Sequence, residues 1–487
     1  MIVRTLLAGS FLVATAAPAI AAAVNVTEQT LFGRPVTVLD NGLVRLAVTP
    51  ELGGRVLAFR LFDGASVANV REDNIGKDPD DPDFVGAEYG GFSDAATSGW
   101  PGPFWGVDYD LRVERDTSNG AATLVAVGEA GGMRIERRMT LEPGRTSLRL
   151  AMTQRNTGEV PKQMTLRLHS EMAAGALADN ADRVSLVTEA GFEVMPVVIG
   201  AEYARFRWMT LAQPWLAVVD AEEQQGVVRR FVGADAPKVF YWVGYNESPE
   251  TLGRRGAFFS LDWFAREATV EPGDSLQAVE TMFLFDGLSK VGLVHDDTAA
   301  GLTADREVFA AGETARLTAG IASAEPWPGG PVELTISREG EVLHRDTRDL
   351  PEARPGQAAT TAFSWPIGDV SDGPIAAEAR FLDDDGDVLG RDRVALTLDT
   401  AKVRGVDDRL EAIERRLAEL REAAERNGLM DRLDVPTELR VIEARRDGAG
   451  ELREQGRFDA AAELADVAIA TADRLDARIA SLSENRP

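Results

Sequence analysis

The feature that most constrains the fold is a long succession of short apolar segments separated by turn-forming residues. Between residues 24 and 290, runs rich in Val, Leu, Phe and Thr are interrupted by Gly, Pro, Asn and Asp. Alternating apolar residues and frequent turn residues are typical of antiparallel β-strands, and no amphipathic helix stands out in this stretch. The segment therefore predicts one large antiparallel β-sandwich.

A second β-rich region runs from residue 298 to residue 400. Segments such as ETARLTAGIAS and PVELTISREGEVL have the composition of short strands, and they are joined by hairpin turns with acidic or glycine residues. The length of the region and its series of strands predict an immunoglobulin-like β-sandwich.

From residue 404 to residue 487 the pattern becomes helical. Leu410, Ile413, Leu417 and Leu420 are separated by three, four and three residues, which is the periodicity of a helix with one apolar face. We expect a helical hairpin or bundle that packs on itself or on a sandwich. A homo-oligomer formed through this tail is the alternative.

The first 23 residues predict an export signal. Arg4 precedes a short apolar run, and small residues allow cleavage after Ala21 or Ala23. The chain contains no cysteine, which excludes disulfides and thiolate chemistry. These features predict a periplasmic or secreted protein of the kind made by Gram-negative bacteria, with no membrane span after signal cleavage.

The charge of the chain excludes one class of partner. With 52 Lys and Arg against 79 Asp and Glu, the formal net charge is −27. Such a chain repels nucleic acids, so we expect no nucleic-acid partner. The sequence has no phosphate loop, dinucleotide fingerprint or complete metal-binding loop, so we expect no cofactor and no metal.

One predicted strand carries an unusual row of polar residues. In MTLRLHSEM, residues 164–172, the polar side chains of Arg167, His169 and Glu171 occupy every second position. A strand places such residues on one face, so a cation, an imidazole and a carboxylate are expected side by side in a polar cleft. An exposed strand whose His169 merely pairs with Glu171 is the alternative.

Three ordered stretches give the first region a family resemblance. NGLVRLAVTPELGGRVLAFRL at 41–61, the hairpin at 140–172 and the closing strands at 256–285 resemble the galactose mutarotase (aldose epimerase) superfamily over about residues 30–288. The resemblance implies a mainly β fold, a galactose mutarotase-like β-supersandwich, with a sugar cleft on its concave face. It makes His169 the match to the general-acid histidine and places Asp262 nearest to the catalytic glutamate.

The implied reaction opens and recloses a cyclic hemiacetal. One group removes the proton of the anomeric hydroxyl while another protonates the ring oxygen, and a carboxylate and a histidine suit these tasks. We therefore expect His169 and Asp262 to act as catalytic residues from the two sides of one sugar ring. Glu267 and Glu280 are alternative bases.

Further residues are predicted to bind the substrate. Arg167 suits sugar hydroxyls, a carboxylate or a sulfate, and Glu171 suits hydroxyls or the orientation of His169. The Gly- and Pro-rich loop at 90–111 adds Trp100, Trp105 and Asp108. The tryptophans of this loop suit either stacking against a sugar or packing of the loop onto the sandwich.

Tyr241, in KVFYWVGYNE, is a further candidate for sugar binding, with packing in the core as its alternative.

Three functions follow from these features. The first is an exported carbohydrate-active protein with mutarotase- or epimerase-like chemistry on a sugar or oligosaccharide. The second is a non-catalytic glycan-binding or assembly protein of the cell envelope, which the two additional regions favour. The third is a polysaccharide lyase, which needs a basic groove for which the candidates are Arg205, Arg207, Arg229 and Arg230.

Overall fold

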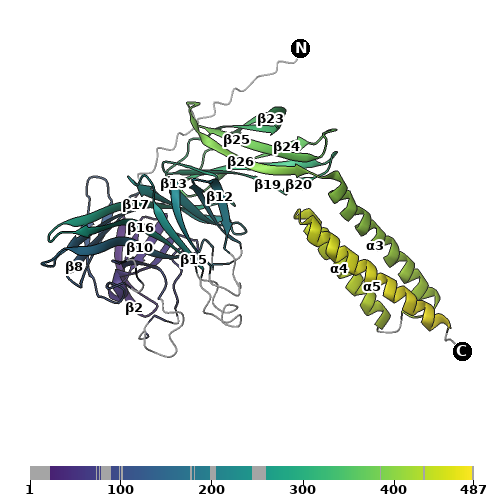
Figure 1. Ribbon diagram of the computed structural model, residues 1–487, viewed down its shortest axis with the longest axis horizontal. Coiled ribbons are helices and arrows are strands. Elements are labelled where there is room, and N and C mark those ends of the chain that lie inside the picture. The colour runs from purple at the N-terminus through teal and green to yellow at the C-terminus, as the bar shows by residue number, and fades with distance from the viewer. Residues whose placement is uncertain are drawn as a thin grey trace, which may run out of the picture.

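The structure is a computed structural model of the 487-residue chain. It describes residues 22–72, 74, 75, 77, 89–97, 99, 102–175, 178, 179, 181–197, 205–243, 259–383, 385–430 and 434–484. The predicted signal segment therefore lies almost wholly outside the described residues. Figure 1 shows a large β domain, a smaller β domain and a helical rod, in chain order.

The large domain consists of two β-sheets. In sheet one the spatial order of the strands is β1–β2–β3–β4–β5–β10–β16–β15–β13, and every neighbouring pair is antiparallel. A four-residue helical turn, α1 (Glu51–Gly54), connects β3 and β4. The strands are β1 (Asn25–Leu31), β2 (Arg34–Asp40), β3 (Val44–Val48), β4 (Val56–Leu61), β5 (Phe92–Ala95), β10 (Lys162–Met172), β16 (Phe259–Val270), β15 (Lys238–Val243) and β13 (Arg205–Asp220).

Sheet two has the order β12–β11–β13–β14–β17–β9–β8–β7–β6, also antiparallel. The long strand β13 belongs to both sheets: its first half pairs with β15 and its second half with β11 and β14. The additional strands are β6 (Asp110–Arg115), β7 (Ala122–Ala130), β8 (Met133–Leu141), β9 (Ser147–Asn156), β11 (Asp182–Thr188), β12 (Gly191–Pro196), β14 (Gln225–Val232) and β17 (Ser275–Asp286).

The core of the large domain lies between these two sheets. Strand β8 alternates strictly between buried and partly buried residues, as expected for a strand with one face on the core. Strand β10 is different, because it is buried on both faces from Met164 to Met172. The outer face of sheet one is therefore covered at β10, which is where the polar row lies.

The second β domain is a sandwich of two sheets. One sheet has the order β18–β19–β21–β24 and the other the order β20–β26–β25–β22–β23, which matches the A-B-E and G-F-C grouping of immunoglobulin-type sandwiches. The strands are β18 (Leu293–His295), β19 (Thr298–Ala304), β20 (Val308–Phe309), β21 (Thr314–Ser323), β22 (Gly330–Arg338), β23 (Glu341–Leu350), β24 (Ala359–Pro366), β25 (Gly373–Leu382) and β26 (Val388–Leu398).

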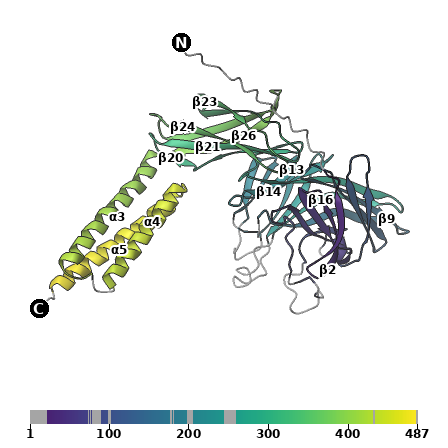
Figure 2. The ribbon, with the colours of Figure 1, turned by 180° about the vertical axis from the view of Figure 1, so that it is seen from behind.

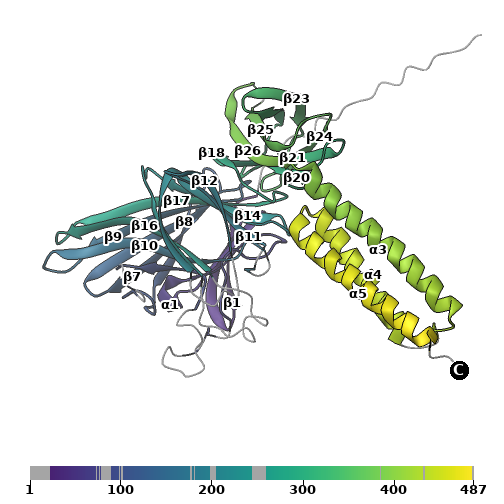
Figure 3. The ribbon, with the colours of Figure 1, turned by 45° about the vertical axis from the view of Figure 1, so that its right-hand side comes forward.

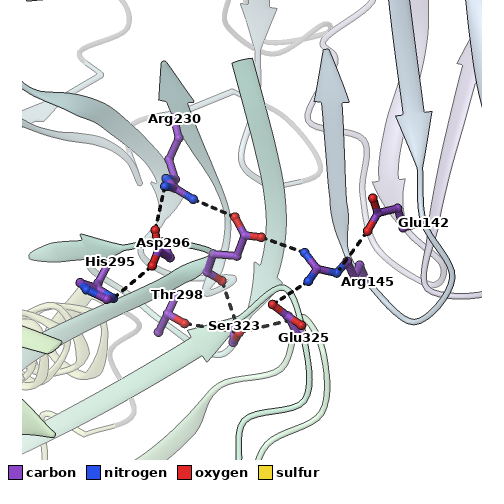
Figure 4. Close-up of polar contacts among 9 residues, drawn as sticks. Glu142, Arg145, Arg230, His295, Asp296, Thr298, Ser323 and Glu325 are labelled. Carbon is purple, nitrogen blue, oxygen red and sulfur yellow. Dashed lines mark hydrogen bonds and ion pairs between the residues drawn. The ribbon is translucent and has the colours of Figure 1, made fainter. Parts of the chain in front are cut away.

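The two β domains share an interface that is apolar inside and charged at its edge. Phe283 and Phe285 of β17 form one buried cluster with Ala299 and Ala322 of the second domain. At the edge, Asp297 lies 3.1 Å from Arg145 and 2.9 Å from Arg230. Figure 4 shows both arginines reaching from the large domain toward the second one.

The C-terminal region is a bundle of three helices, α3 (Thr400–Arg426), α4 (Asp434–Glu454) and α5 (Phe458–Glu484). Ile413, Leu417 and Leu420 are buried in the core of the bundle, so the apolar face predicted from the sequence packs internally. Figures 2 and 3 show the helices side by side in a rod that extends from the second β domain. None of the described helices is long and apolar enough to span a membrane.

A regular series of ion pairs joins α3 to α5. Lys402 pairs with Asp459 at 2.9 Å, Arg409 with Asp466 at 2.7 Å, and Arg416 with Asp473 at 2.6 Å. The pairs recur every seven residues on both helices, so the same faces stay in contact along the rod. The predicted mainly β fold with a helical C-terminus is therefore confirmed, while an oligomeric role for the tail stays a prediction.

Candidate functional site

The row of polar residues on β10 lies on one face of sheet one, as the alternation predicted. Leu166 and Leu168 belong to the core between the sheets. Arg167, His169 and Glu171 occupy the intervening positions and therefore point to the opposite, outer face. The three side chains are buried there.

Asp262 of β16 joins this row from the neighbouring strand. Nδ1 of His169 lies 2.9 Å from Oδ1 of Asp262, and Nε2 of His169 lies 3.3 Å from Oε1 of Glu171. Nε of Arg167 donates to Oδ2 of Asp262 at 2.8 Å, and Nη2 of Arg167 contacts the same oxygen. The imidazole therefore lies between two carboxylates, one of which is held by a guanidinium.

This network is almost completely shielded from water. His169 is 5% exposed and Asp262 is 0% exposed. Burial raises the pKa of Asp262, but the neighbouring His169 and Arg167 outweigh burial and bring the pKa below its ordinary value. Asp262 is therefore ionised at neutral pH, as a carboxylate that holds a histidine in place must be.

The contact between His169 and Asp262 corrects one expectation. The two groups were expected to face each other across the width of a sugar ring, yet the atoms of their side chains lie 2.9 Å apart. No ring fits between groups at hydrogen-bond distance. The sequence predicted a strand for each residue but could not predict that the two strands are neighbours, because the pairing of β10 with β16 joins segments far apart in the chain.

The ladder between β10 and β16 is interrupted at this contact. Strands β10 and β16 pair at Leu168–Trp263 and again at Glu171–Ser260, with no ladder pairing between. Inside this interruption the Asp262 carboxylate accepts a hydrogen bond of 3.4 Å from the backbone N–H of Ser170. The side chain of Asp262 thus takes over a donor of the interrupted ladder.

A buried arginine supports β16 from the core side. Nη1 of Arg229, on β14, donates to the carbonyl oxygen of Leu261 at 2.6 Å, directly beside Asp262. Arg229 also pairs with Glu280, and both side chains are fully buried. Glu280, an alternative base in the sequence analysis, therefore belongs to the core, where burial raises its pKa despite Arg229. The other alternative, Glu267, is exposed.

The residues predicted from the loop at 90–111 have separate outcomes. Trp100 lies outside the described residues. Trp105 is buried, stacks on Tyr89 with ring centroids 4.6 Å apart and clusters with Leu52, which favours packing of the loop. Asp108 is exposed, and the structure does not bring it into the network around His169.

Of the two possibilities for Tyr241, sugar binding and packing in the core, the structure favours packing in the core. Tyr241 is buried in the core and packs against Phe259, with ring centroids 6.4 Å apart. Its neighbours Phe240 and Trp242 point to the outer face instead, since residues alternate along a strand. A run of three aromatic residues has no polar member to reveal which of them faces the core.

The basic groove expected for a lyase is not assembled by the described side chains. Arg229 pairs with Glu280 in the core. Arg230 pairs with Asp296 and Asp297 at the domain interface, and Arg207 pairs with Glu193. These three side chains are neutralised individually, and the side chain of Arg205, the fourth candidate, lies outside those that the structure describes.

A second buried polar cluster escaped the sequence analysis. Asp94 of β5 lies 3.1 Å from Nε of Arg137 and accepts a 3.0 Å hydrogen bond from the hydroxyl of Tyr109. Asp94 lies opposite Leu168 in the ladder, so it faces the core beneath the polar row. Burial raises its pKa despite Arg137. The sequence contains no local signal for this cluster, because Asp94, Arg137 and Tyr109 come from three separate segments.

No group of three or more metal-ligand side chains is assembled among the described residues. The donors beside His169 are already engaged with one another or with Arg167. What the network offers is proton transfer between neighbouring groups and hydrogen bonding to a polar ligand.

Comparisons with known proteins give a structural likeness only. No family model and no curated protein matches the sequence. A galactose mutarotase-like protein from Clostridium acetobutylicum matches with 11% identity, 54% of this chain, 99% of that chain and a TM-score of 0.40. A putative aldose 1-epimerase from Escherichia coli K12 matches with 11% identity, 54% of this chain, 100% of that chain and a TM-score of 0.37.

The chain thus resembles mutarotase-like structures over about half of its length. A TPR-domain containing protein from Parabacteroides distasonis also matches, with 11% identity, 52% of this chain and a TM-score of 0.39. The chain spans about half of that protein's length, 47%. At such identities and TM-scores the likeness is loose, and the proposals below rest on the side chains of this chain.

Proposed function

We propose that the chain is an exported carbohydrate-active protein that binds a sugar on the outer face of sheet one. The observation that carries the proposal is the position of His169, held between Asp262 and Glu171 in a nearly water-free network. A histidine held by a carboxylate is an arrangement suited to acid–base catalysis. Mutarotase-like interconversion of anomers is the reaction that requires no more than this.

In the proposed reaction the sugar ring opens and recloses. The ring oxygen and the anomeric hydroxyl are bonded to the same carbon, so two neighbouring groups can reach both from one side of the sugar, and no ring has to fit between them. His169 gives a proton to the ring oxygen, Glu171 takes the proton of the anomeric hydroxyl, and the bond between the anomeric carbon and the ring oxygen breaks. Ring closure on the other face reverses both transfers. Asp262, fully buried and paired with Arg167, is a positioning residue that holds the imidazole.

The test is the rate of anomer exchange, measured by exchange NMR on a panel of aldoses with and without the protein. We expect the wild-type protein to accelerate exchange above buffer and His169→Ala to reduce the acceleration by about 100-fold or more. His295→Ala is the matched control, because His295 is an exposed histidine at the end of β18 and should leave the rate unchanged. Exchange at the buffer rate with every aldose would rule out the enzyme.

A non-catalytic glycan-binding protein is the second candidate. The direct contact between His169 and Asp262 favours it, because the side chains are engaged with each other rather than separated by the width of a ring. Glycan binding by the wild-type protein together with anomer exchange at the buffer rate would identify this function.

A further inference from the structure

The outer face of sheet one carries large aromatic side chains in water beside the buried network. Phe206 is 68% exposed and Trp208 is 49% exposed, both on the first half of β13. Phe240 of β15 is partly exposed. We call these three residues the aromatic platform. Exposed aromatic groups on a folded surface are unfavourable in water, and a contiguous patch of them marks a binding surface.

The strand register connects the platform with the network around His169. Trp208 pairs with Phe240, and Phe240 pairs with Asp262, so the three residues form one row across β13, β15 and β16. Residues in such a row project from the same face of a sheet. Two strand spacings of about 4.8 Å separate Trp208 from Asp262, roughly 10 Å in total, which is comparable with the length of a disaccharide.

Contacts between the rings make the connection continuous. The ring of Trp208 lies 4.7 Å from that of Phe240 and 4.7 Å from that of Phe264, measured between centroids. The guanidinium of Arg167 lies 4.7 Å from the centroid of Phe264. The platform therefore leads through Phe264 to the arginine that holds Asp262.

The platform is held in place before any ligand arrives. The ammonium of Lys238 lies 4.7 Å from the Trp208 ring centroid, a cation–π contact that fixes one part of the indole. A tryptophan fixed by Lys238, Phe240 and Phe264 loses little conformational freedom on binding. Half of its surface nevertheless remains in water.

The chemistry of the surface favours a carbohydrate as its occupant. A sugar ring presents C–H groups on its faces, which stack on aromatic planes, and hydroxyls on its edge, which suit a charged neighbour such as Lys238. An anionic membrane surface is a poor partner for a chain with a net charge of −27. The platform is also continuous with the network around His169, which is proposed to bind a sugar, and this favours a carbohydrate as well.

We propose that the aromatic platform is a stacking subsite for one unit of a glycan whose next unit extends toward His169. The substrate class is then an oligosaccharide, and a free monosaccharide fills only part of the site. This inference rests on the proposed function, since it assigns a longer ligand to the same face.

The test compares binding of an oligosaccharide and its component monosaccharide. A glycan array carrying mono- to hexasaccharides identifies the strongest binder, and calorimetry then measures its dissociation constant and that of its monosaccharide for the full chain. We expect Trp208→Ala and Phe206→Ala to weaken oligosaccharide binding by about tenfold or more. Binding of the monosaccharide should stay within about twofold.

Phe62→Ala is the matched control. Phe62 is 49% exposed, as Trp208 is, and it also lies under a cation, the guanidinium of Arg45 at 5.5 Å. Its removal should leave glycan binding unchanged. Because Phe206, Trp208 and Phe62 are exposed, each of the three variants should keep the melting temperature of the wild-type protein to within a few degrees.

The possible failures are distinguishable. If the wild-type protein binds no glycan, the proposed function fails and the subsite fails with it. If the wild-type protein binds glycans but Trp208→Ala binds the oligosaccharide as tightly, only the subsite is wrong. If sedimentation shows a dimer that Trp208→Ala dissociates, a second copy of the chain covers the platform and the glycan subsite is wrong as well.

Discussion

Asp262 is the residue on which the polar network depends most. It is fully buried, it contacts both Arg167 and His169, and it accepts a hydrogen bond from the backbone of Ser170. A buried carboxylate of this kind is tolerated only because its charge is compensated by neighbours. Removing the charge deprives the buried guanidinium of Arg167 of the carboxylate that faces it from β16.

Asp262→Asn should therefore destabilise the protein. We expect the free energy of unfolding to fall by about 3–5 kcal/mol, the range for breaking a buried ion pair. Urea unfolding followed by tryptophan fluorescence measures it. Asp108→Asn is the control, because Asp108 is exposed and should change the value by about 0.5 kcal/mol at most. A loss below about 1 kcal/mol for Asp262→Asn would mean that the network contributes little to stability.

Asp182 gives a second prediction at this scale, because burial raises its pKa from 3.8 to about 7. The folded protein then holds a proton that the unfolded chain has released between these pH values. Stability attributable to Asp182 is complete below pH 4 and is lost as the pH rises to about 7, by on the order of 4 kcal/mol.

Asp182→Asn removes this pH dependence. The stability of the variant relative to the wild-type protein should increase from pH 5 to about pH 7 and level off above it, and urea unfolding at each pH measures the difference. The amide keeps an acceptor for the backbone N–H of Asp179, which donates to Asp182 at 3.0 Å. A difference that does not change with pH would contradict a raised pKa.

For the strands, the sequence predicted which face a side chain occupies only where polar and apolar residues alternate. In β10 polar and apolar residues alternate, so the alternation alone predicts that His169 lies on the face opposite the core. In β15 the run Phe240, Tyr241 and Trp242 contains no polar residue that shows which side faces the core, so the sequence left Tyr241 open between sugar binding and packing in the core. The contact between His169 and Asp262 needed the register between β10 and β16, which long-range pairing determines.

Helices were predicted more completely than strands, because the hydrogen bonds of a helix join residues that are close in the sequence. The apolar series ending at Leu420 forms the buried face of α3, and the helix ends at Arg426 before the Asn-Gly pair. Within this helix, charged and apolar residues are expected to differ sharply in their contribution to stability. Arg416 and Leu417 are adjacent and allow a direct comparison.

Leu417→Ala should lower the free energy of unfolding by about 2–5 kcal/mol, because it leaves a cavity in the core of the bundle. Arg416→Ala removes a partly exposed pair with Asp473 and should cost less than about 1 kcal/mol. Urea unfolding followed by circular dichroism at 222 nm compares the two variants. Equal losses would indicate that the bundle is held by its ion pairs rather than by its apolar core.

At the scale of the whole molecule, the large domain supplies the candidate site and the other regions are attached to it. The second β domain is joined through the cluster around Phe283 and Ala322, with Asp297 bridging two arginines at the edge. The helical bundle is joined in turn through Val403 and Phe458, which pack on Ala310. In the described part of the chain, the ion pairs that hold the network around His169 lie within the large domain.

The central claim is that a glycan lies on the outer face of sheet one, between the aromatic platform and His169. A crystal structure of the wild-type protein soaked with the trisaccharide that binds most tightly tests it most directly. The account predicts one sugar ring stacked on Trp208 and Phe206 and the next ring directed toward His169. A trisaccharide bound instead on sheet two, on the second β domain or on the helical bundle would contradict the claim.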